Sequence, residues 1–265
     1  MLPNITPSRP DTSHSFPAAS GYDSEFGTDD VVRQDTGLGA PFKRAFDCMA
    51  ALGLLIVSGP VMLACMLLVK VTSRGPAIYS QVRLGRGRRP FRIYKIRTMT
   101  HNCEALTGAR WAAVNDSRVT LVGRFLRRSH LDELPQLWNI LRGDMSLVGP
   151  RPERPEFVDK LEPLIDRYGE RMLVRPGVTG LAQVRLPADT DIESVRRKLL
   201  YDRYYVAGGG LWLDLRLLVI TGLYLVGVPF RLSCQALVMP GAAEVEAGTS
   251  VRLRDLNALP CGETQ

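Results

Sequence analysis

Two adjacent carboxylates, Asp132 and Glu133, are the residues of this chain best suited to chemistry. They fall at the predicted start of a helix, where the helix dipole favours anions and is expected to keep Asp132 ionised. Free backbone N–H groups at the same position can hold a phosphate. Basic residues surround the pair in the sequence, namely Arg124, Arg127, Arg128 and Arg151. Carboxylates among cations suggest a site that handles phosphate, with one carboxylate as the attacking group.

The helix that carries the pair is predicted over Leu131–Leu141, because apolar residues recur there at i, i+3, i+4 and i+7. Gly143 closes it. Ser129 fits a capping box, whereas Pro135 favours a start at residues 131–132, since proline is tolerated only in the first turn. In the simpler interpretation Asp132 only caps this turn, and Glu133 is a solvated acid within it. The cations around them favour the chemical interpretation.

Two further segments present an arginine on a rigid backbone. Pro150 and Pro152 fix the chain on both sides of Arg151, and a rigid arginine suits bidentate recognition of phosphate. The simpler alternative is an ordinary proline-rich turn with an exposed arginine. The segment Arg175–Gly180 repeats the arrangement of an arginine beside a rigid turn.

The stretch from Arg83 to Arg97 contains seven basic residues and no acidic one. Short strands separated by a glycine turn are expected within residues 76–99. In one interpretation the basic residues form a solvated or lipid-facing stripe. In the other, Lys95 and Arg97 point into a site, and we expect both interpretations to hold in part.

Charge and cysteine usage narrow the class of protein. The net charge is +7, although residues 1–40 carry two basic and six acidic side chains, so the rest of the chain is strongly basic. That part should seek anionic partners, which include nucleic acid, anionic lipid and phosphorylated substrates. The five cysteines are scattered without a CxxC pair, which favours a reducing compartment. No His/Cys cluster has zinc spacing, so no zinc site is expected.

An uncharged apolar run from Cys48 to Val69 is long enough to cross a bilayer, at about 33 Å for a straight helix. Gly59 and Pro60 interrupt it, and a kink is expected there. Basic residues flank both ends, namely Lys43, Arg44, Lys70 and Arg74. Because the positive-inside rule places both flanks in the cytoplasm, residues 42–71 are predicted to enter and leave on one face. A straight span and a buried core helix are the alternatives.

These elements predict an α/β fold, mostly helical with a small sheet, in a membrane-embedded monotopic domain with a re-entrant helix-break-helix and interfacial amphipathic helices. Helices are expected over residues 153–172 and 191–206. The apolar stretch 211–228 is expected to pack in the core or lie in the membrane interface. The predicted organisation is a disordered tail at 1–40, a folded domain at 41–231 and a C-terminal tail at 232–265.

Five motifs occur in one order and together resemble the bacterial sugar transferases, the monotopic polyprenyl-phosphate phosphoglycosyl transferases. The resemblance covers roughly residues 41–230. The motifs are Lys43–Asp47, Tyr94–Met99, Leu131–Leu137, Gly143–Pro152 and Arg175–Gly180.

The resemblance implies transfer of a sugar 1-phosphate from a UDP-sugar to undecaprenyl phosphate, with UMP as the leaving group. This is the first membrane step of exopolysaccharide, lipopolysaccharide O-antigen or related glycan synthesis. It places the protein at the bacterial inner membrane, with the site on the cytoplasmic face and downstream glycosyltransferases as possible partners. The implied nucleophile is Asp132, which would form an aspartyl phosphosugar intermediate, and Glu133 would hold Mg²⁺ with it. The implied substrate-binding residues are Lys95, Arg97, Arg127, Arg151 and Arg175.

This chain departs from the family pattern at two positions. Gly59 stands where serine is frequent before the proline of the membrane break, so the bend is expected to be looser or to use Ser58. Leu181 stands where many members have tryptophan. The chain is expected to resemble the short form, without an N-terminal membrane domain of four helices.

Two other classes of function are alternatives to this enzymatic one. The first is a membrane scaffold that has kept the fold and lost activity, which the intact carboxylates and arginines disfavour. The second is a nucleic-acid-binding protein, which is not expected because no nucleic-acid fold signature accompanies the basic stretch. The motifs do not identify the sugar.

Overall fold

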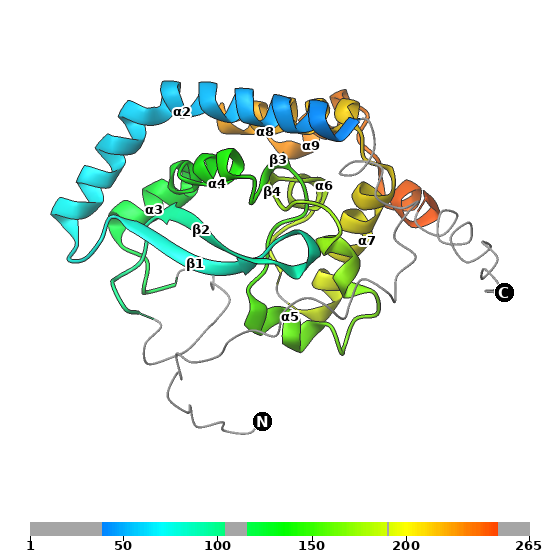
Figure 1. Ribbon diagram of the computed structural model, residues 1–265, viewed down its shortest axis with the longest axis horizontal. Helices are drawn as coiled ribbons and strands as arrows, with labels where there is room; N and C mark the ends of the chain where they lie inside the picture. The colour runs from blue at the N-terminus through cyan, green and yellow to red at the C-terminus, as the bar shows by residue number, and fades with distance from the viewer. Residues whose placement is uncertain (1–38, 104–115, 190, 249–265) are drawn as a thin grey trace.

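The structure is a computed structural model that describes residues 39–103, 116–189 and 191–248. A long helix, α2 (Gly39–Thr72), extends over a body of shorter helices and two small two-stranded sheets (Figure 1). The predicted mostly helical fold with little sheet is confirmed. The tail predicted at residues 1–40 lies almost entirely outside the described residues.

Helix α2 carries the apolar run of the sequence. Among the described residues it is the one helix long and apolar enough to cross a membrane, and only 11% of its most apolar stretch is buried. Pro60 lies within it, and Figure 1 shows the helix bending along its length. The hydroxyl of Ser58 donates to the carbonyl of Leu54 at 2.6 Å, one turn earlier. Ser58 is therefore bonded next to the break, but not to the Ile56 carbonyl that a proline at position 60 leaves free.

The N-terminal half of α2 is fixed to the body by charged side chains. Lys43 forms an ion pair with the buried Asp214 at 2.6 Å. Arg44 donates to the carbonyls of Ile140 and Leu141 at 2.5 and 2.9 Å, and so satisfies the free carbonyl end of another helix. These contacts explain why basic residues precede the apolar run.

The C-terminal half of α2 is fixed to the same body by apolar packing. Cys65 and Val69 form a buried cluster with Ile96 and Leu126. Beyond the helix, the carbonyl and hydroxyl of Ser73 accept from a guanidinium at 2.9 and 2.7 Å. Both ends of one apolar helix therefore contact one folded unit.

The predicted strands form an antiparallel hairpin. Strand β1 (Ile78–Leu84) pairs with β2 (Pro90–Ile96) over their whole length, and a short 3-10 turn, η1 (Arg86–Arg88), joins them. Asn139, fully buried in the helix α4 (Gln136–Arg142), fixes this helix against β2. Its amide donates to a carbonyl of β2 at 2.7 Å and its oxygen accepts from a backbone N–H of β2 at 3.1 Å.

The helix predicted over Leu131–Leu141 is broken in two. A short α3 (Leu121–Arg128) is followed by a 3-10 turn, η2 (Leu131–Glu133), and α4 begins only after Pro135. The capping box at Ser129 is wrong, because this hydroxyl donates back to the carbonyl of Phe125 at 3.0 Å and ends α3. The alternative start at residues 131–132 holds for the 3-10 turn η2 alone, since α4 begins at Gln136. Gly143 closes α4 with φ 90°, as predicted.

A short parallel pair of strands, β3 (Ser146–Val148) and β4 (Gly177–Thr179), lies at the centre of the body. The buried Asp47 of α2 accepts from the hydroxyl of Ser146 at 2.7 Å. A Cβ atom at Gly177 would meet backbone atoms of both strands at under 3.0 Å. The two segments can approach this closely only because this position has no side chain.

Replacing Gly177 with alanine is therefore expected to lower the free energy of unfolding by about 1–3 kcal/mol. The measurement is the thermal midpoint of the detergent-solubilised protein. Gly222→Ala is the matched control, because a Cβ there meets nothing within 4 Å and alanine favours a helix. Equal midpoints for the two variants would contradict the close approach of β3 and β4.

The remaining helices complete the body. The helix predicted over 153–172 is interrupted into α5 (Pro155–Leu161) and a 3-10 turn, η3 (Tyr168–Met172), because Arg167 takes a left-handed conformation between them. The helix predicted over 191–206 is confirmed. The later helices are α6 (Leu181–Arg185), α7 (Ile192–Gly208), α8 (Leu211–Leu225) and α9 (Phe230–Ala236).

The folded unit extends beyond the predicted boundary at residue 231. That boundary falls inside α9, and residues 242–248 are also helical. Cys234, Met239 and Val245 are buried in the main core. The rest of the predicted C-terminal tail, 249–265, lies outside the described residues.

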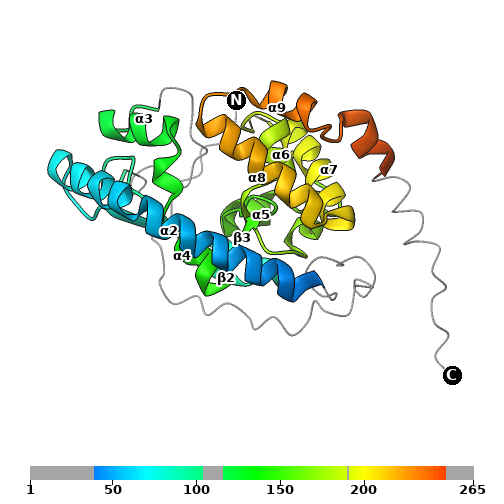
Figure 2. The ribbon, with the colours of Figure 1, turned by 90° about the horizontal axis from the view of Figure 1, so that it is seen from above.

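Exposed apolar side chains gather on helices that lie along one side of the molecule. Helices α2 and α8 lie side by side in both views (Figures 1 and 2). Helix α8 buries one face in the core, which confirms core packing for residues 211–228, and exposes another face, so its place in the membrane interface stays a prediction. The most exposed apolar residues of α2, α3 and α8 include Phe42, Ile56, Val57, Val71, Leu121 and Trp212.

Candidate active site

The carboxylate pair lies in η2, between two helices that point in different directions. His130 precedes it with φ 56°, and this left-handed residue turns the chain sharply after α3. The His130 ring lies edge-on to Tyr224 of α8, with 5.6 Å between centroids. Asp132 is buried at 7% exposure. The pair therefore lies in a 3-10 turn that precedes α4, rather than in the first turn of that helix, and close to the helix surface that carries exposed apolar residues.

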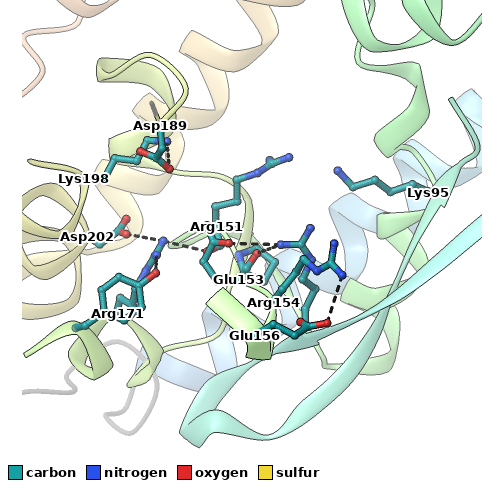
Figure 3. A network of polar contacts seen from close by, with 12 residues as sticks. Lys95, Arg151, Glu153, Arg154, Glu156, Arg171, Asp189, Lys198 and Asp202 are labelled. Atoms are coloured by element: carbon teal, nitrogen blue, oxygen red, sulfur yellow. Dashed lines mark hydrogen bonds and ion pairs between the residues drawn. The ribbon is translucent and has the colours of Figure 1, made fainter. Parts of the chain in front are cut away.

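Two cations meet at one oxygen of Glu133. Lys95 of β2 donates to its Oε1 at 2.6 Å, and Arg151, from the loop after β3, donates to the same atom at 2.8 Å. Figure 3 shows the two cationic side chains extending towards one another from opposite walls of the site. Three segments that are separate in the sequence thus combine to form one charged cluster.

The electrostatics of this cluster keep Glu133 and Arg151 charged. Burial acts to raise the pKa of Glu133, but Arg151 and Lys95 outweigh it, and the pKa of that carboxyl lies well below its usual range. Glu133 in turn raises the pKa of Arg151. Burial lowers the pKa of Lys95, although Glu133 opposes the change. Glu133 is therefore a fixed anion between two cations.

Asp132 differs from its neighbour. Burial raises its pKa, and the negative charge of Glu133 adds to the increase, while Lys95 and Arg127 act in the opposite direction. The helix dipole contributes little here, since a single 3-10 turn has little dipole and the carboxylate is largely removed from water, and the ionised state of Asp132 stays a prediction. The pair thus combines one well-compensated carboxylate with one that is less stable in its charged form.

The other predicted substrate-binding arginines lie at different places. Arg127 of α3 donates to the Thr98 hydroxyl at 2.9 Å and is close enough to favour ionisation of Asp132. Arg97 is buried and donates to Ser73 at the end of α2. Arg175 donates to the carbonyl of Gly143 at 3.2 Å. The contacts of Arg97 and Arg175 thus connect them to α2 and to the end of α4, and their role in substrate binding stays a prediction.

The chemistry of the carboxylate pair suits a magnesium ion only in the company of a substrate. No group of three His, Cys, Asp or Glu side chains forms a metal site within the part of the chain that the structure describes. Mg²⁺ commonly binds one or two carboxylates together with substrate phosphates and water. Asp132 and Glu133 supply such a pair of hard oxygen donors.

Sequence reasoning missed residues that hold this site in place. Arg171, Asp202 and Tyr168 are buried behind the loop that carries Arg151. The signal that points to them is charge on otherwise apolar helix faces, which indicates a paired group, since charges are rarely buried alone. Asn139 gave a related signal, an uncharged polar side chain on the buried face of α4.

The model of the bacterial sugar transferase family matches residues 38–227. A UDP-N-acetylgalactosamine-undecaprenyl-phosphate N-acetylgalactosaminephosphotransferase of Aeromonas hydrophila is 46% identical over 172 residues, 65% of this chain and 40% of the relative. A UDP-glucose:undecaprenyl-phosphate glucose-1-phosphate transferase of Caulobacter vibrioides is 45% identical over 181 residues, 68% of this chain and 67% of the relative. The exopolysaccharide production protein PSS of Rhizobium leguminosarum bv. phaseoli is 39% identical over 181 residues, 66% of this chain and 90% of the relative.

The helical body with its cation-braced carboxylate pair and exposed apolar helix is thus that of a membrane-associated family of transferases. The chain belongs to the bacterial sugar transferase family. It spans less than half the length of the Aeromonas relative.

Proposed function

We propose that this protein transfers a sugar 1-phosphate from a UDP-sugar to undecaprenyl phosphate and releases UMP, as the first membrane step of exopolysaccharide or related glycan synthesis. The relatives' names supply the substrate classes, and they differ in the sugar. The observation that carries the proposal is the buried Asp132 beside Glu133, whose Oε1 accepts from both Lys95 and Arg151.

In the first step, a carboxylate oxygen of Asp132 attacks the phosphorus that bears the sugar. The new P–O bond replaces the bond to UMP, which leaves with the bridging oxygen and its electron pair. A carboxylate is a weak nucleophile, but covalent catalysis splits one hard displacement into two easier ones. Lys95, Arg127 and Arg151 stabilise the negative charge that the pyrophosphate and the attacking carboxylate bring together.

In the second step, a phosphate oxygen of undecaprenyl phosphate attacks the same phosphorus. The bond to Asp132 breaks, the carboxylate is regenerated, and the sugar is left on a polyprenyl diphosphate. Burial of Asp132 favours transfer to the lipid over hydrolysis, because the intermediate forms where little water competes with the acceptor. The second step therefore uses the electrostatic environment of the first, with the lipid phosphate as its nucleophile and Asp132 as its leaving group.

We propose that Asp132 and Glu133 hold Mg²⁺ when the nucleotide sugar binds. The ion would neutralise charge on the pyrophosphate. The fixed negative charge of Glu133 suits this role, since Lys95 and Arg151 keep it ionised. The remaining cationic side chains then orient the phosphates relative to Asp132.

We also propose that α2 is re-entrant in the bacterial inner membrane, with the active site on the cytoplasmic face. Both halves of the helix contact one folded unit, through Lys43 and Arg44 at one end and Cys65 and Val69 at the other. Between these contacts the side chains of Ile56 and Val57 are exposed. A straight helix that spans the bilayer would separate its two ends by the thickness of the membrane, so these contacts favour entry and exit on one face.

Single cysteines introduced at both ends of α2 test this topology in a cysteine-free background. Phe42→Cys and Arg74→Cys are expected to resist a membrane-impermeant maleimide in intact spheroplasts and to react after permeabilisation. Both positions are exposed. Arg89 in the hairpin turn is exposed as well, and Arg89→Cys serves as the control for a cytoplasmic position. Labelling of either flank from outside would contradict the re-entrant arrangement.

The proposed reaction is tested by incubating the purified protein with undecaprenyl phosphate, Mg²⁺ and a panel of UDP-sugars. UMP release with one donor, dependent on the lipid acceptor, is the expected result and identifies the sugar. A folded preparation that releases no UMP with any donor, while a related transferase is active on the same lipid, would contradict the proposal.

A further inference from the structure

The short segment that carries Arg151 is held at every carbonyl. Residues 150–153 contain two prolines, so only two backbone N–H groups are available to fix them. Instead, the four consecutive carbonyls each accept a hydrogen bond from a different residue, at 2.9 to 3.1 Å. The donors, in order, are the backbone of Gly177, the guanidinium groups of Arg171 and Arg83, and the backbone of Leu84.

Arg171 is the donor to the carbonyl of Arg151 itself. Its guanidinium is 8% exposed and has three neighbours: the Arg151 carbonyl at 3.1 Å, the Tyr168 hydroxyl at 2.8 Å and the Asp202 carboxylate at 2.9 Å. Asp202 lies on α7 and is 3% exposed. Figure 3 shows this chain of contacts running from Asp202 through Arg171 to the backbone below the Arg151 side chain.

The contact with the Arg151 carbonyl fixes the one soft part of this backbone. The rings of Pro150 and Pro152 set their own φ angles and restrict the residues before them. The φ rotation of Arg151 is what remains, and a charge-assisted hydrogen bond to the Arg151 carbonyl holds it. The direction in which the Arg151 side chain leaves the backbone is thereby set towards Glu133, 2.8 Å from its terminal nitrogen.

We propose that Arg171, oriented by Asp202, is a positioning residue for the phosphoryl transfer, acting through the backbone of Arg151. This inference rests on the proposed function of the site. A buried ion pair contributes little net stability, because the cost of removing two charges from water offsets their attraction. The contact of Arg171 with the Arg151 backbone gives the Arg171–Asp202 pair a role in positioning the Arg151 side chain. Such positioning matters because a misplacement of about 1 Å at a reacting centre can cost 10²-fold in rate.

The test is a double-mutant cycle on kcat and KM for the UDP-sugar, with the variants Arg171→Met, Arg151→Met and the pair together. Arg171→Met is expected to lower kcat by roughly 10- to 100-fold. In the Arg151→Met background the same substitution should have no further effect on kcat, because the group it positions is already absent. Arg171→Lys, which keeps a charged donor, is expected to recover part of the loss.

A matched control lies one residue further along α7. Arg203 forms an ion pair with Glu170 of η3 at 2.6 Å and is similarly buried. It joins the same two elements as the Arg171–Asp202 pair, but successive helix side chains point roughly 100° apart. Arg203→Met is expected to reduce the thermal midpoint about as much as Arg171→Met while leaving kcat unchanged.

If Arg171→Met does not fold, Asp202→Asn replaces it in the double-mutant cycle. It keeps the shape of the side chain and removes the charge that orients Arg171, so a smaller loss of kcat is expected, again absent in the Arg151→Met background. The same cycle is measured on the dissociation constant for UDP, which requires no turnover.

Effects of Arg171 and Arg151 that multiply independently, in kcat and in UDP binding, would overturn the positioning role. An equal loss of kcat in Arg203→Met would do the same, since it would assign the effect to general loosening of η3 and α7. A further outcome separates this inference from the proposed function. If the UDP dissociation constants of the four proteins show the predicted coupling while the wild-type protein releases no UMP, the proposed function is contradicted and the positioning of Arg151 by Arg171 is supported.

Discussion

Asp132→Asn is expected to abolish UMP release, with a loss of roughly 10³-fold or more, while the protein stays folded and in the membrane. The amide has the same shape as the carboxylate and lacks the nucleophilic oxygen. Because burial raises the pKa of Asp132, the site disfavours the charged form, so a neutral amide there should cost little stability. The measurements are UMP release and the thermal midpoint of the same preparation.

The control for this change is Asp159→Asn, the same substitution on the exposed face of α5. It should leave both measurements unchanged. A donor labelled in the sugar, supplied without the lipid acceptor, should leave label on the wild-type protein in a form that hydroxylamine removes, as expected of an acyl phosphate. Near-normal turnover by Asp132→Asn, or the same label on that variant, would refute the assignment of the nucleophile.

Removal of magnesium is expected to have an effect of similar size. Exhaustive chelation should reduce UMP release to background, and added Mg²⁺ should restore it, because the substrate pyrophosphate and two carboxylates would otherwise bring unbalanced negative charge together. Glu133→Gln should raise the Mg²⁺ concentration that gives half of the maximal rate. The measurement is a titration of UMP release against free Mg²⁺.

The fold itself should not respond to the chelator. Glu133 is already held by Lys95 and Arg151 at 2.6 and 2.8 Å, so the site has a defined arrangement of charge without a metal ion. The thermal midpoint measured with and without chelator, in the absence of substrate, is therefore expected to be the same. Full activity after chelation would exclude a required divalent cation.

Local patterns in the sequence were sufficient for several elements. Apolar residues without charge over Cys48–Val69 predict a long apolar helix, and strand-like residues on both sides of a glycine turn predict the short strands that the structure shows as β1 and β2. Gly143 was correctly placed at the end of α4. Each of these depends on interactions between residues that are neighbours in the chain, and those are readable from spacing.

Helix continuity was predicted less well. The periodic apolar residues of 131–141 and 153–172 were taken as single helices, yet left-handed residues such as Arg167 and the 3-10 turn η2 divide them. The C-terminal boundary was set by polar composition, whereas Cys234 and Val245 pack in the core. In each case packing against distant elements outweighed local periodicity, which a composition argument does not include.

The sequence by itself determined which residues could form this site: a carboxylate pair, a lysine in a basic strand and an arginine between two prolines. It did not determine where their side chains meet. Only the tertiary structure brings Lys95 and Arg151 to one oxygen of Glu133, from 38 and 18 residues away. It also directs the Arg97 guanidinium to the carbonyl of Ser73 and the Arg171 guanidinium to the carbonyl of Arg151. The physical reason is that a charge is accepted in a protein interior only where a partner of opposite charge or a hydrogen-bond acceptor lies within reach, and that partner is supplied by the fold.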